Sequence, residues 1–509
     1  MFQHQPIEQK KVKVETFDKT LQVIHSKKEV SKMERFVAIW LKRDFRLHDN
    51  HALFKTIEYC KQTNSKWVMF VHLTKEQLTR HTFENEYYLY TIAQFKKRME
   101  TNQMTVHLLS GSEEDVITSL KKSYPTLSHI YTNTNEVGDE ALREERLKTA
   151  AITQGISFYS LLDSHLHYAN EVKKKDGTFY KVYTPYYKMW RTLKKPSIYK
   201  CNHAEIKFYA HVAPPMDVKT ETLFYTFLNE IKKITFPVGE EKAVQLFQQF
   251  LKEDLPTYSK KRNEPYWDAT SHMSPFLKVG AISVRSMYHV VKQVLDETGS
   301  KEAEAFIKEL AWREFFQMIY YYYPHSAEEE VQEKYRQLKW KRDEEQFERW
   351  KEGKTGFPFV DAGMRQLKEE GWMHNRLRMV VASFLTKDYL LDWRLGEKYF
   401  KEMLIDYEPS QNIGNWQWAA SVGMDAVPYF RIFNPITQGE KFDKSGEYIR
   451  KYVKELQDVD VTYLHTPFKM SKSEQKKSSC TIGIDYPYPT VNHKVQREKA
   501  LAFYRFELC

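Results

Sequence analysis

Residues 363–400 read GMRQLKEEGWMHNRLRMVVASFLTKDYLLDWRLGEKYF. Apolar side chains recur there at the three-to-four-residue spacing of amphipathic helices, and Gly371 separates one helical segment from the next. Segments of this kind fill the chain beyond residue 236, over 239–253, 278–297, 301–319, 359–370, 374–390 and 395–404. Alternating strand patterns are almost missing from this half, so we expect an all-helical domain over residues 236–475.

The first part of the chain has a different pattern. Short β-rich runs alternate with helical stretches, at 36–41, 66–73, 104–111, 129–134 and 156–162. This alternation favours a doubly wound parallel sheet. The first run continues into WLKRDFRLHDNHAL (40–53), which lacks the glycine motifs that cradle the phosphates of a dinucleotide or of ATP. We therefore expect an α/β domain over 35–165 that is not an obvious nucleotide binder.

Three further segments complete the predicted organisation. Residues 1–34 mix seven lysines with five acids and have no strong hydrophobic period, which predicts a disordered extension. Residues 166–235 contain the turn-rich stretches KKKDG, KKPS and VAPPM, which are typical of an interdomain linker. Residues 476–509 form a C-terminal tail with a proline-broken stretch followed by one helical run.

Composition restricts the function classes. No run of eighteen uncharged apolar residues occurs and the N-terminus has no apolar signal core, so we expect a soluble, cytoplasmic protein that does not enter a membrane. The four cysteines have no paired spacing, which favours a reducing compartment and no metal site. The net charge of +10 suits a polyanion such as DNA, but charge alone does not decide between binding and not binding it.

One helical face in the second half combines three kinds of side chain. In FIKELAWREFF (306–316), Glu309, Trp312 and Arg313 stand at positions i, i+3 and i+4. A carboxylate, an indole and a guanidinium would thus converge. From this segment alone, a structural ion pair beside a packed tryptophan is the simpler interpretation.

A second group of polar residues lies further along. Asn375, Arg378 and Met379 share one face of the predicted helix over 374–390, and Asp406 and Glu408 follow in LIDYEPSQNIGNWQW. A buried pair of Arg378 and Asp406 would add little stability, because desolvating both charges offsets their attraction. Such pairs often serve a ligand instead.

The quoted stretch 363–400 and the later NWQWAASVGMDAVPYFRIFNPITQGEKFD (415–443) resemble the photolyase/cryptochrome family, and within it the class I bacterial enzymes for cyclobutane pyrimidine dimers. The resemblance extends to residues 40–53, to YTPYYKMW (183–190) and to ELAWREFF (309–316). It implies an α/β antenna domain joined by a long linker to a helical domain that holds FAD in a U shape. The sequence pattern predicts the same layout independently.

The resemblance assigns the cofactor residues. Those for the flavin diphosphate would be Tyr258, Thr270, Ser271, His272, Met273, Ser274 and Arg313. Those around the isoalloxazine ring would be Asn375, Arg378, Asp406 and Asn412, and Glu408 would also bind the cofactor. The family often has arginine and leucine at the positions of His272 and Met273, so only hydroxyl and backbone contacts carry over there.

Asn412 matches the family position that faces flavin N5. An amide does not readily supply a proton, whereas an aspartate does, so asparagine favours the fully reduced anion, FADH⁻. Repair photolyases typically have asparagine at this position, which indicates repair rather than signalling.

Three tryptophans match the electron-transfer chain of the family. Trp416 would lie next to the flavin, Trp393 would follow, and Trp340 would lie near the surface. Each tryptophan considered singly is more often a core residue, but all three positions of the chain are filled.

The resemblance also implies a DNA substrate. A pyrimidine dimer drawn out of the duplex would be bound by Glu309, Trp312, Asn375, Met379 and Trp418, and Arg376 would neutralise flanking phosphates. Met379 and Trp418 favour cyclobutane dimers over the (6-4) lesion. The implied reaction is electron transfer from light-excited reduced FAD to the dimer, which Glu309 and Asn412 would assist.

Several alternatives stay open. A (6-4) photolyase, a cryptochrome-type signalling protein and a non-enzymatic DNA-binding protein with a decayed pocket could all share this fold. A second, light-harvesting chromophore is common in the family, either a folate or a deazaflavin. Folate-binding relatives usually have Asn-Glu where this chain has Gly138-Asp139, so the sequence does not choose between the two. We expect a monomer that binds UV-damaged DNA.

Overall fold

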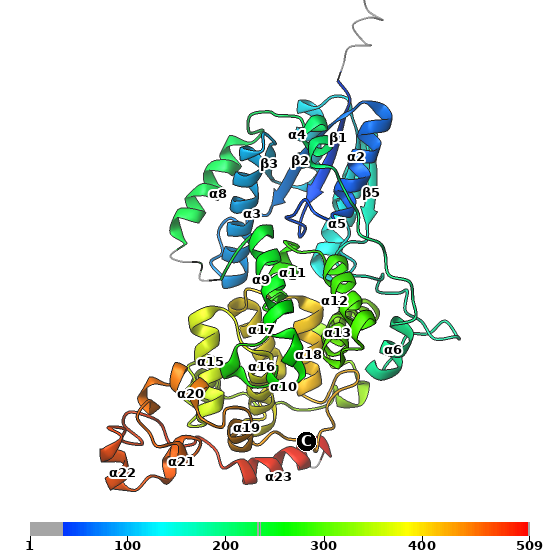
Figure 1. Ribbon diagram of the computed structural model, residues 1–509. Helices are drawn as coiled ribbons and strands as arrows, with labels where there is room; N and C mark the ends of the chain where they lie inside the picture. Colours follow the sequence, from blue (N-terminus) through cyan, green and yellow to red (C-terminus); the bar gives the residue numbers. More distant parts are fainter. Residues whose placement is uncertain (1–33, 232–233, 235, 507–509) are drawn as a thin grey trace, which may run out of the picture.

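The computed structural model describes residues 34–231, 234 and 236–506. The predicted extension over 1–34 thus falls almost wholly outside the described residues. An α/β domain lies at one end of the molecule and a larger helical domain lies beneath it (Figure 1). The predicted fold class is therefore confirmed.

The α/β domain is built on one parallel sheet with the strand order β3-β2-β1-β4-β5. The strands are β1 (Phe36–Leu41), β2 (Lys66–Leu73), β3 (Val106–Ser110), β4 (Leu127–Asn133) and β5 (Ser157–Leu161). The intervening helices are α2 (His51–Thr63), α3 (Phe83–Thr101), α4 (Glu113–Ser123) and α5 (Gly138–Thr153). The first two strands begin and end where the sequence pattern predicts.

Successive residues of the central strand β1 face opposite layers of helices. Val37 and Ile39 belong to the core that includes residues of α2 and α3, whereas Ala38 and Trp40 belong to the core that includes residues of α4 and α5. Both faces are therefore covered. This double burial explains why the strands read as continuous apolar runs.

The segment predicted as a linker contains helices that the sequence pattern did not predict. They are α6 (Tyr183–Trp190), α7 (His203–Tyr209) and α8 (Val218–Glu230). Helix α6 packs on α13 (Lys301–Tyr322) of the helical domain, and α8 packs on α3 of the α/β domain. Helices α6 and α8 are anchored by aromatic side chains, such as Tyr186 and Phe224, that enter a shared core.

The helical domain contains long amphipathic helices and several short ones. Up to the cavity they are α9 (Glu240–Glu253), α10 (Tyr258–Lys261), α11 (Ser274–Val279), α12 (Val284–Thr298), α13 (Lys301–Tyr322), α14 (Glu344–Lys351) and α15 (Pro358–Glu370). They continue with α16 (Asn375–Ser383), the π-helical turn η5 (Phe384–Asp388), α17 (Trp393–Met403), α18 (Pro409–Ala419), α19 (Pro435–Phe442), α20 (Glu447–Tyr452), α21 (Val461–Leu464), α22 (Lys472–Lys477) and α23 (His493–Tyr504). Short 3₁₀ turns lie at Leu255–Thr257, Pro265–Trp267, Pro324–Ala327, Glu333–Tyr335, Lys454–Leu456 and Pro467–Lys469.

The helix expected over 278–297 is interrupted at its start. Gly280 adopts φ +64° after α11, and a Cβ at this position would lie 1.9 Å from the carbonyl oxygen of Arg43. Only glycine permits this close approach of the loop after β1, so α12 begins four residues later. Phe45 also donates its backbone N–H to the carbonyl of Val279, over 3.3 Å, across the same contact.

Buried charges also join the two domains. The Arg285 side chain is fully buried and donates to Asp163 over 2.7 Å and to Asp49 over 3.1 Å. Arg46 donates to the other oxygen of Asp163 over 2.6 Å. Because these charges satisfy one another, they fix the orientation of the sheet over the helical domain.

The last helix belongs to the helical domain by its packing. Phe503 and Tyr504 of α23 enter the same core as Trp393 and Trp416, and α23 contacts η5. The packing therefore continues past residue 475, where we placed the start of a tail. None of the helices in the described part of the chain is both long and apolar enough to cross a membrane.

Candidate functional site

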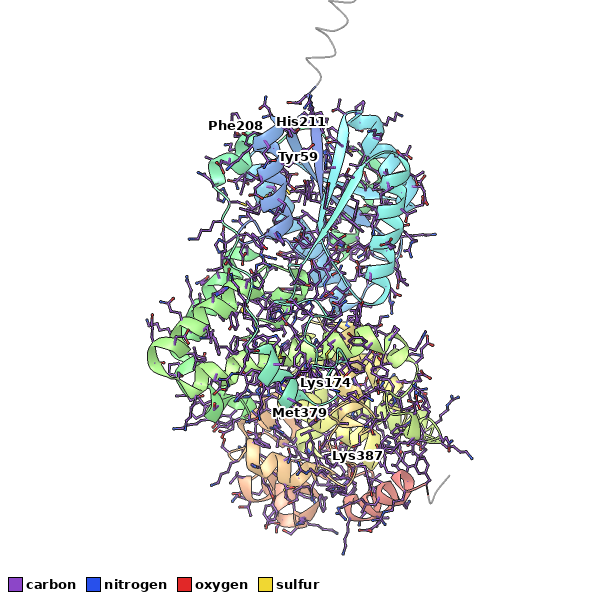
Figure 2. The ribbon with its side chains drawn as sticks, turned by 90° about the vertical axis from the view of Figure 1, so that its right-hand side faces the viewer. Tyr59, Lys174, Phe208, His211, Met379 and Lys387 are labelled. Atoms are coloured by element: carbon purple, nitrogen blue, oxygen red, sulfur yellow. The ribbon has the colours of Figure 1, made fainter. Side chains whose placement is uncertain are left out.

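A cavity opens in the helical domain, lined by α16, the end of α17 and α18. Figure 2 places Met379, which lines it, far from Tyr59 and His211 of the α/β domain. The cavity brings together eight of the predicted site residues: Asn375, Arg378, Met379, Asp406, Glu408, Asn412, Trp416 and Trp418. These residues are up to 43 positions apart in sequence, and the packing of α16 and α17 on α18 brings them to one wall.

An ion pair lies in the cavity wall. Arg378 donates from Nη2 to Oδ2 of Asp406 over 2.8 Å, and the Ser274 hydroxyl donates to the same oxygen over 2.6 Å. The other oxygen, Oδ1, is buried and has no hydrogen-bond partner among the described residues. A buried charged oxygen without a partner is costly, so this atom is positioned for a ligand that donates to it.

Asn412 has a fixed orientation in the same cavity. Its Nδ2 donates to Oε1 of Glu397 over 3.0 Å and to the backbone carbonyl of Glu397 over 3.1 Å. Burial raises the pKa of Glu397, although hydrogen bonds from Asn412 and Tyr407 act in the opposite direction. Glu397 was not predicted from the sequence, but it lies one helical turn after Trp393, and this spacing could have indicated that it faces the same side of the helix.

His374 caps the helix that carries Asn375, Arg378 and Met379. Its Nδ1 accepts from the backbone N–H of Arg376 over 3.1 Å, so this nitrogen is unprotonated. Burial, with a smaller contribution from the nearby His272, lowers the pKa of His374 to about 3. The cap therefore holds the first turn of α16 in place as a neutral imidazole.

Trp416 lies under the cavity in tight packing. Its ring is 5.0 Å from Phe400 and 6.1 Å from Trp350, and its indole N–H is buried without a partner among the described residues. Gly396 of α17 touches the indole, because a Cβ there would lie 2.1 Å from it. Only a glycine at this position lets α17 and α18 approach so closely.

The two outer tryptophans of the predicted chain share one carboxylate. Trp340 and Trp393 donate their indole N–H groups to Oε1 of Glu330, over 3.0 Å and 3.1 Å. Trp393 is fully buried and Trp340 is partly exposed. Glu330 was not predicted from the sequence, because it lies in an irregular segment ten residues before Trp340.

Three predicted substrate residues do not line this cavity. Glu309 is bound to Arg262 over 2.7 Å, and Arg376 donates to Asn263 over 2.7 Å. The Trp312 ring stacks on Tyr183 of α6, with centroids 3.6 Å apart and an interplanar angle of 7°. One face of Trp312 is therefore covered by a helix of the segment that the sequence pattern predicts to be a linker.

The predicted diphosphate residues lie around the loop before α11. Thr270 has a buried hydroxyl without a partner among the described residues, and Ser274 reaches Asp406. His272 adopts φ +52° and binds Asp268 over 2.7 Å, whereas the Met273 side chain enters the core. The side chain of Met273 therefore points to the protein interior, so only the backbone of this residue is available to contact a cofactor.

The other predicted cofactor residues have protein partners. Ser271 accepts from the N–H of Met273 over 3.4 Å, and Tyr258 lies buried against Phe306. Arg313 donates to the carbonyl of Ser164 over 2.5 Å. Glu408 lines the cavity, but its carboxylate pairs with Arg43 of the α/β domain.

The residues present fit FAD. A flavin ring offers N–H donors and carbonyl acceptors on a flat apolar body, and the cavity offers Asp406 Oδ1, the Asn412 amide and the apolar Trp416 and Met379. Within the described residues no cluster of histidine, cysteine, aspartate and glutamate with metal-binding geometry occurs. The fold and the cavity define a two-domain flavoprotein.

Comparison with known proteins identifies the family. Residues 37–203 match the family model described as DNA photolyase, and residues 306–505 match the FAD binding domain of DNA photolyase. The chain is 46% identical to the deoxyribodipyrimidine photo-lyase of Alkalihalophilus pseudofirmus, covering 92% of this chain and 97% of that protein. The chain belongs to the DNA photolyase family of flavoenzymes.

Solved structures agree. A class III photolyase from Agrobacterium tumefaciens superimposes with a TM-score of 0.85 at 32% identity, over 93% of this chain and 98% of that one. An archaeal photolyase from Sulfolobus tokodaii with two FAD molecules gives a TM-score of 0.77 at 27% identity, over 92% and 100%. The family is thus settled, whereas our assignment to class I stays a prediction.

Proposed function

We propose that this chain repairs cyclobutane pyrimidine dimers in DNA by light-driven electron transfer from reduced FAD. The observation that carries the proposal is the composition of the cavity described above. It places the residues expected on the flavin, Asp406 and Asn412, beside those expected on the dimer, Met379 and Trp418. Electron transfer between two groups requires this closeness.

The cofactor would be held by the polar atoms that lack partners. Asp406 Oδ1 would accept a hydrogen bond from FAD and the Thr270 hydroxyl would form another, and the Arg378 guanidinium holds the Asp406 carboxylate in its orientation. Asn412, held by Glu397, presents an amide rather than an acid. When bound, reduced FAD supplies the light-excited electron that the dimer accepts.

The substrate residues act by apolar contact and position. Trp418 offers a flat face to an extruded pyrimidine pair, and stacking on an aromatic ring contributes about 1–3 kcal/mol per base. Asn375 and Met379 lie at the same wall. A dimer is already poorly stacked in the duplex, so its extrusion costs less than that of an intact base.

Charged residues nearby would orient the DNA. Arg376 is held by Asn263 and lies 4.2 Å over the ring of Phe442, which leaves its charge available to phosphates without strict sequence preference. Glu309 would hydrogen-bond the dimer once its contact with Arg262 rearranges. The chain Trp416, Trp393 and Trp340 would resupply electrons to the cofactor from the surface.

A second chromophore remains an expectation. Gly138 begins α5 with φ +66°, and a Cβ there would lie 3.4 Å from the ring of Tyr320 in the helical domain. A larger residue at this position would therefore press against the other domain. The identity of the chromophore, folate or deazaflavin, is best read from the absorption spectrum of the purified protein.

The decisive experiment measures repair directly. Purified, chemically reduced protein is mixed with UV-irradiated oligothymidine under blue light and in darkness, and the recovery of thymine absorbance is followed. Recovery only in light supports the proposal. A protein that binds FAD but restores no absorbance, or that repairs only an oligonucleotide with a (6-4) lesion, contradicts it. Trp418→Ala should reduce affinity for the irradiated oligonucleotide about tenfold or more, because it removes a stacking surface.

A further inference from the structure

Glu330 connects the two outer tryptophans of the chain through one oxygen atom. Oε1 accepts the indole N–H of Trp340 over 3.0 Å and that of Trp393 over 3.1 Å. The other oxygen, Oε2, accepts from Nη2 of Arg394 over 2.8 Å. These three side-chain partners of the carboxylate are all donors, and two of them are indoles.

The carboxylate is buried and charged. Its side chain is only 4% exposed. Burial raises the pKa of Glu330, but hydrogen bonds from Arg394 and Trp340 outweigh burial and hold the pKa below its usual value. A fixed negative charge thus lies within hydrogen-bond distance of both indoles, in a region where water screens it little.

The two indoles differ in their other neighbours. The guanidinium of Arg394 lies 4.8 Å over the ring of Trp393. Trp340 instead packs against Phe503 at 5.1 Å and Tyr504 at 6.3 Å, both on α23, and no cation lies over its ring among the described residues. A positive charge on Trp393 is therefore opposed by Arg394, whereas one on Trp340 is not.

We propose that Glu330, together with Arg394, is a positioning residue that makes Trp340 the favoured site of oxidation in the tryptophan chain. The inference rests on the proposed function, because it assumes that the tryptophans resupply electrons to a light-excited oxidised flavin. In the step concerned, one electron passes from Trp340 to oxidised Trp393. Trp393 becomes neutral, and Trp340 carries one positive charge and keeps its N–H proton on the hydrogen bond to Glu330.

The rest of the sequence balances in electrons. Trp393 was oxidised by giving one electron to Trp416, and Trp416 by giving one to the flavin. An external thiol reductant then returns one electron to Trp340, which is the partly exposed member. Because Glu330 is already paired with Arg394, it acts by its charge rather than as the final proton acceptor.

The test uses Glu330→Gln in the FAD-loaded protein, with Glu329→Gln as the matched control. The introduced glutamine keeps an oxygen acceptor for the indoles but removes the charge. Glu329 is 44% exposed and pairs with Arg336, so its replacement changes the same net charge away from the tryptophans. After a laser flash on the oxidised protein without thiol, transient absorption follows the lifetime of the tryptophan cation radical.

In Glu330→Gln, we expect this lifetime to shorten about tenfold, because the positive charge on the two outer indoles loses its counter-ion and the electron returns faster from the flavin to the oxidised tryptophan. Glu329→Gln should match the unchanged protein. An unchanged lifetime in Glu330→Gln, in a variant with normal FAD content, would overturn the inference. Two further readouts exclude a merely structural effect: the melting temperature, and the ¹H–¹⁵N resonances of the two indoles, which should move only in Glu330→Gln.

Failure of the proposed function would look different. Repair by chemically reduced, unsubstituted protein needs no electron from the tryptophans. If that protein does not repair dimers yet the radical lifetime depends on Glu330, the proposed function fails and the role of Glu330 stands. If repair occurs and the lifetime does not change, only the role of Glu330 fails.

Discussion

Glu397 holds the side chain of Asn412 by two hydrogen bonds. Nδ2 of Asn412 donates to Oε1 of Glu397 over 3.0 Å and to the backbone carbonyl of Glu397 over 3.1 Å. Both acceptors face the nitrogen, so the amide oxygen of Asn412 is turned away from Glu397. The donor and acceptor ends of the residue expected beside the flavin are therefore set by α17, one helix away. An aspartate could not form this pair without a proton between the two acids.

Replacing Asn412 by aspartate should make stability depend on pH. Two carboxyl groups about 3 Å apart cannot both ionise, so the folded protein would bind one more proton than the unfolded chain near neutral pH. The free energy of unfolding should then fall as pH rises from 5 to 8, to about 1–3 kcal/mol below that of the unsubstituted protein. Urea unfolding at several pH values measures this. Asn415→Asp, exposed on the same helix, serves as the control, and equal pH slopes for the two variants would contradict the prediction.

Replacing Arg378 by glutamine should weaken both the fold and FAD binding. The Asp406 side chain is only 2% exposed and would lose its cation. Because Arg378 is partly exposed, we expect the free energy of unfolding to fall by about 2–3 kcal/mol. Denaturant unfolding of the FAD-free protein measures the stability. The ratio of the flavin absorbance at about 450 nm to the protein absorbance at about 280 nm measures the FAD content. The double variant with Asp406→Asn should recover stability but not FAD. Recovery of both would show that Asp406 Oδ1 does not bind the cofactor.

Replacing Gly396 by alanine should displace Trp416. The new Cβ would lie 2.1 Å from the indole, far below contact distance, so α17 and α18 must separate. We expect a loss of about 1–3 kcal/mol in the free energy of unfolding, and a shift in tryptophan fluorescence. Lys398→Ala, on the same helix, should have little effect. A Gly396→Ala protein as stable as this control would show that the two helices are not packed as described.

Replacing His374 by asparagine should remove an acid-sensitive cap. The folded pKa of about 3 lies below the unfolded value near 6.5, so the unfolded chain binds more protons between these values. The stability contributed by neutral His374 is therefore present above pH 6.5 and is lost as pH falls toward 3. Asparagine caps helices without titrating, so the variant should lose less stability between pH 7 and 5, by about 1–2 kcal/mol. Chemical unfolding at the two pH values decides, and an identical loss in both proteins would contradict the role of the cap.

The regular elements could largely be predicted because their patterns are local. The strands over 36–41 and 66–73 were read from continuous apolar runs, and Gly371 was read as a helix end. The start of α12 was missed, because Gly280 breaks the helix to make room for the backbone of Arg43, more than two hundred residues away. The helices of the linker were missed because their few aromatic residues acquire meaning only when α3 and α13 cover them.

The candidate site shows the same division. The helical spacing that puts Arg378 and Asn375 on one face is local, and the sequence also indicated Asp406 as the partner of Arg378. The contacts of Glu330 with two indoles and of Trp312 with Tyr183 join irregular or distant segments, so no period in the sequence indicates them.

The sequence by itself determined the class of fold, the family and the residue types available for the chemistry, since periodicity and motif strings depend on neighbours along the chain. Only the tertiary structure decided which polar atoms of those residues remain unpaired, which tryptophans share a carboxylate and which aromatic face is covered. These depend on the approach of helices such as α17 and α18, whose close packing requires a glycine at position 396 against the indole of Trp416.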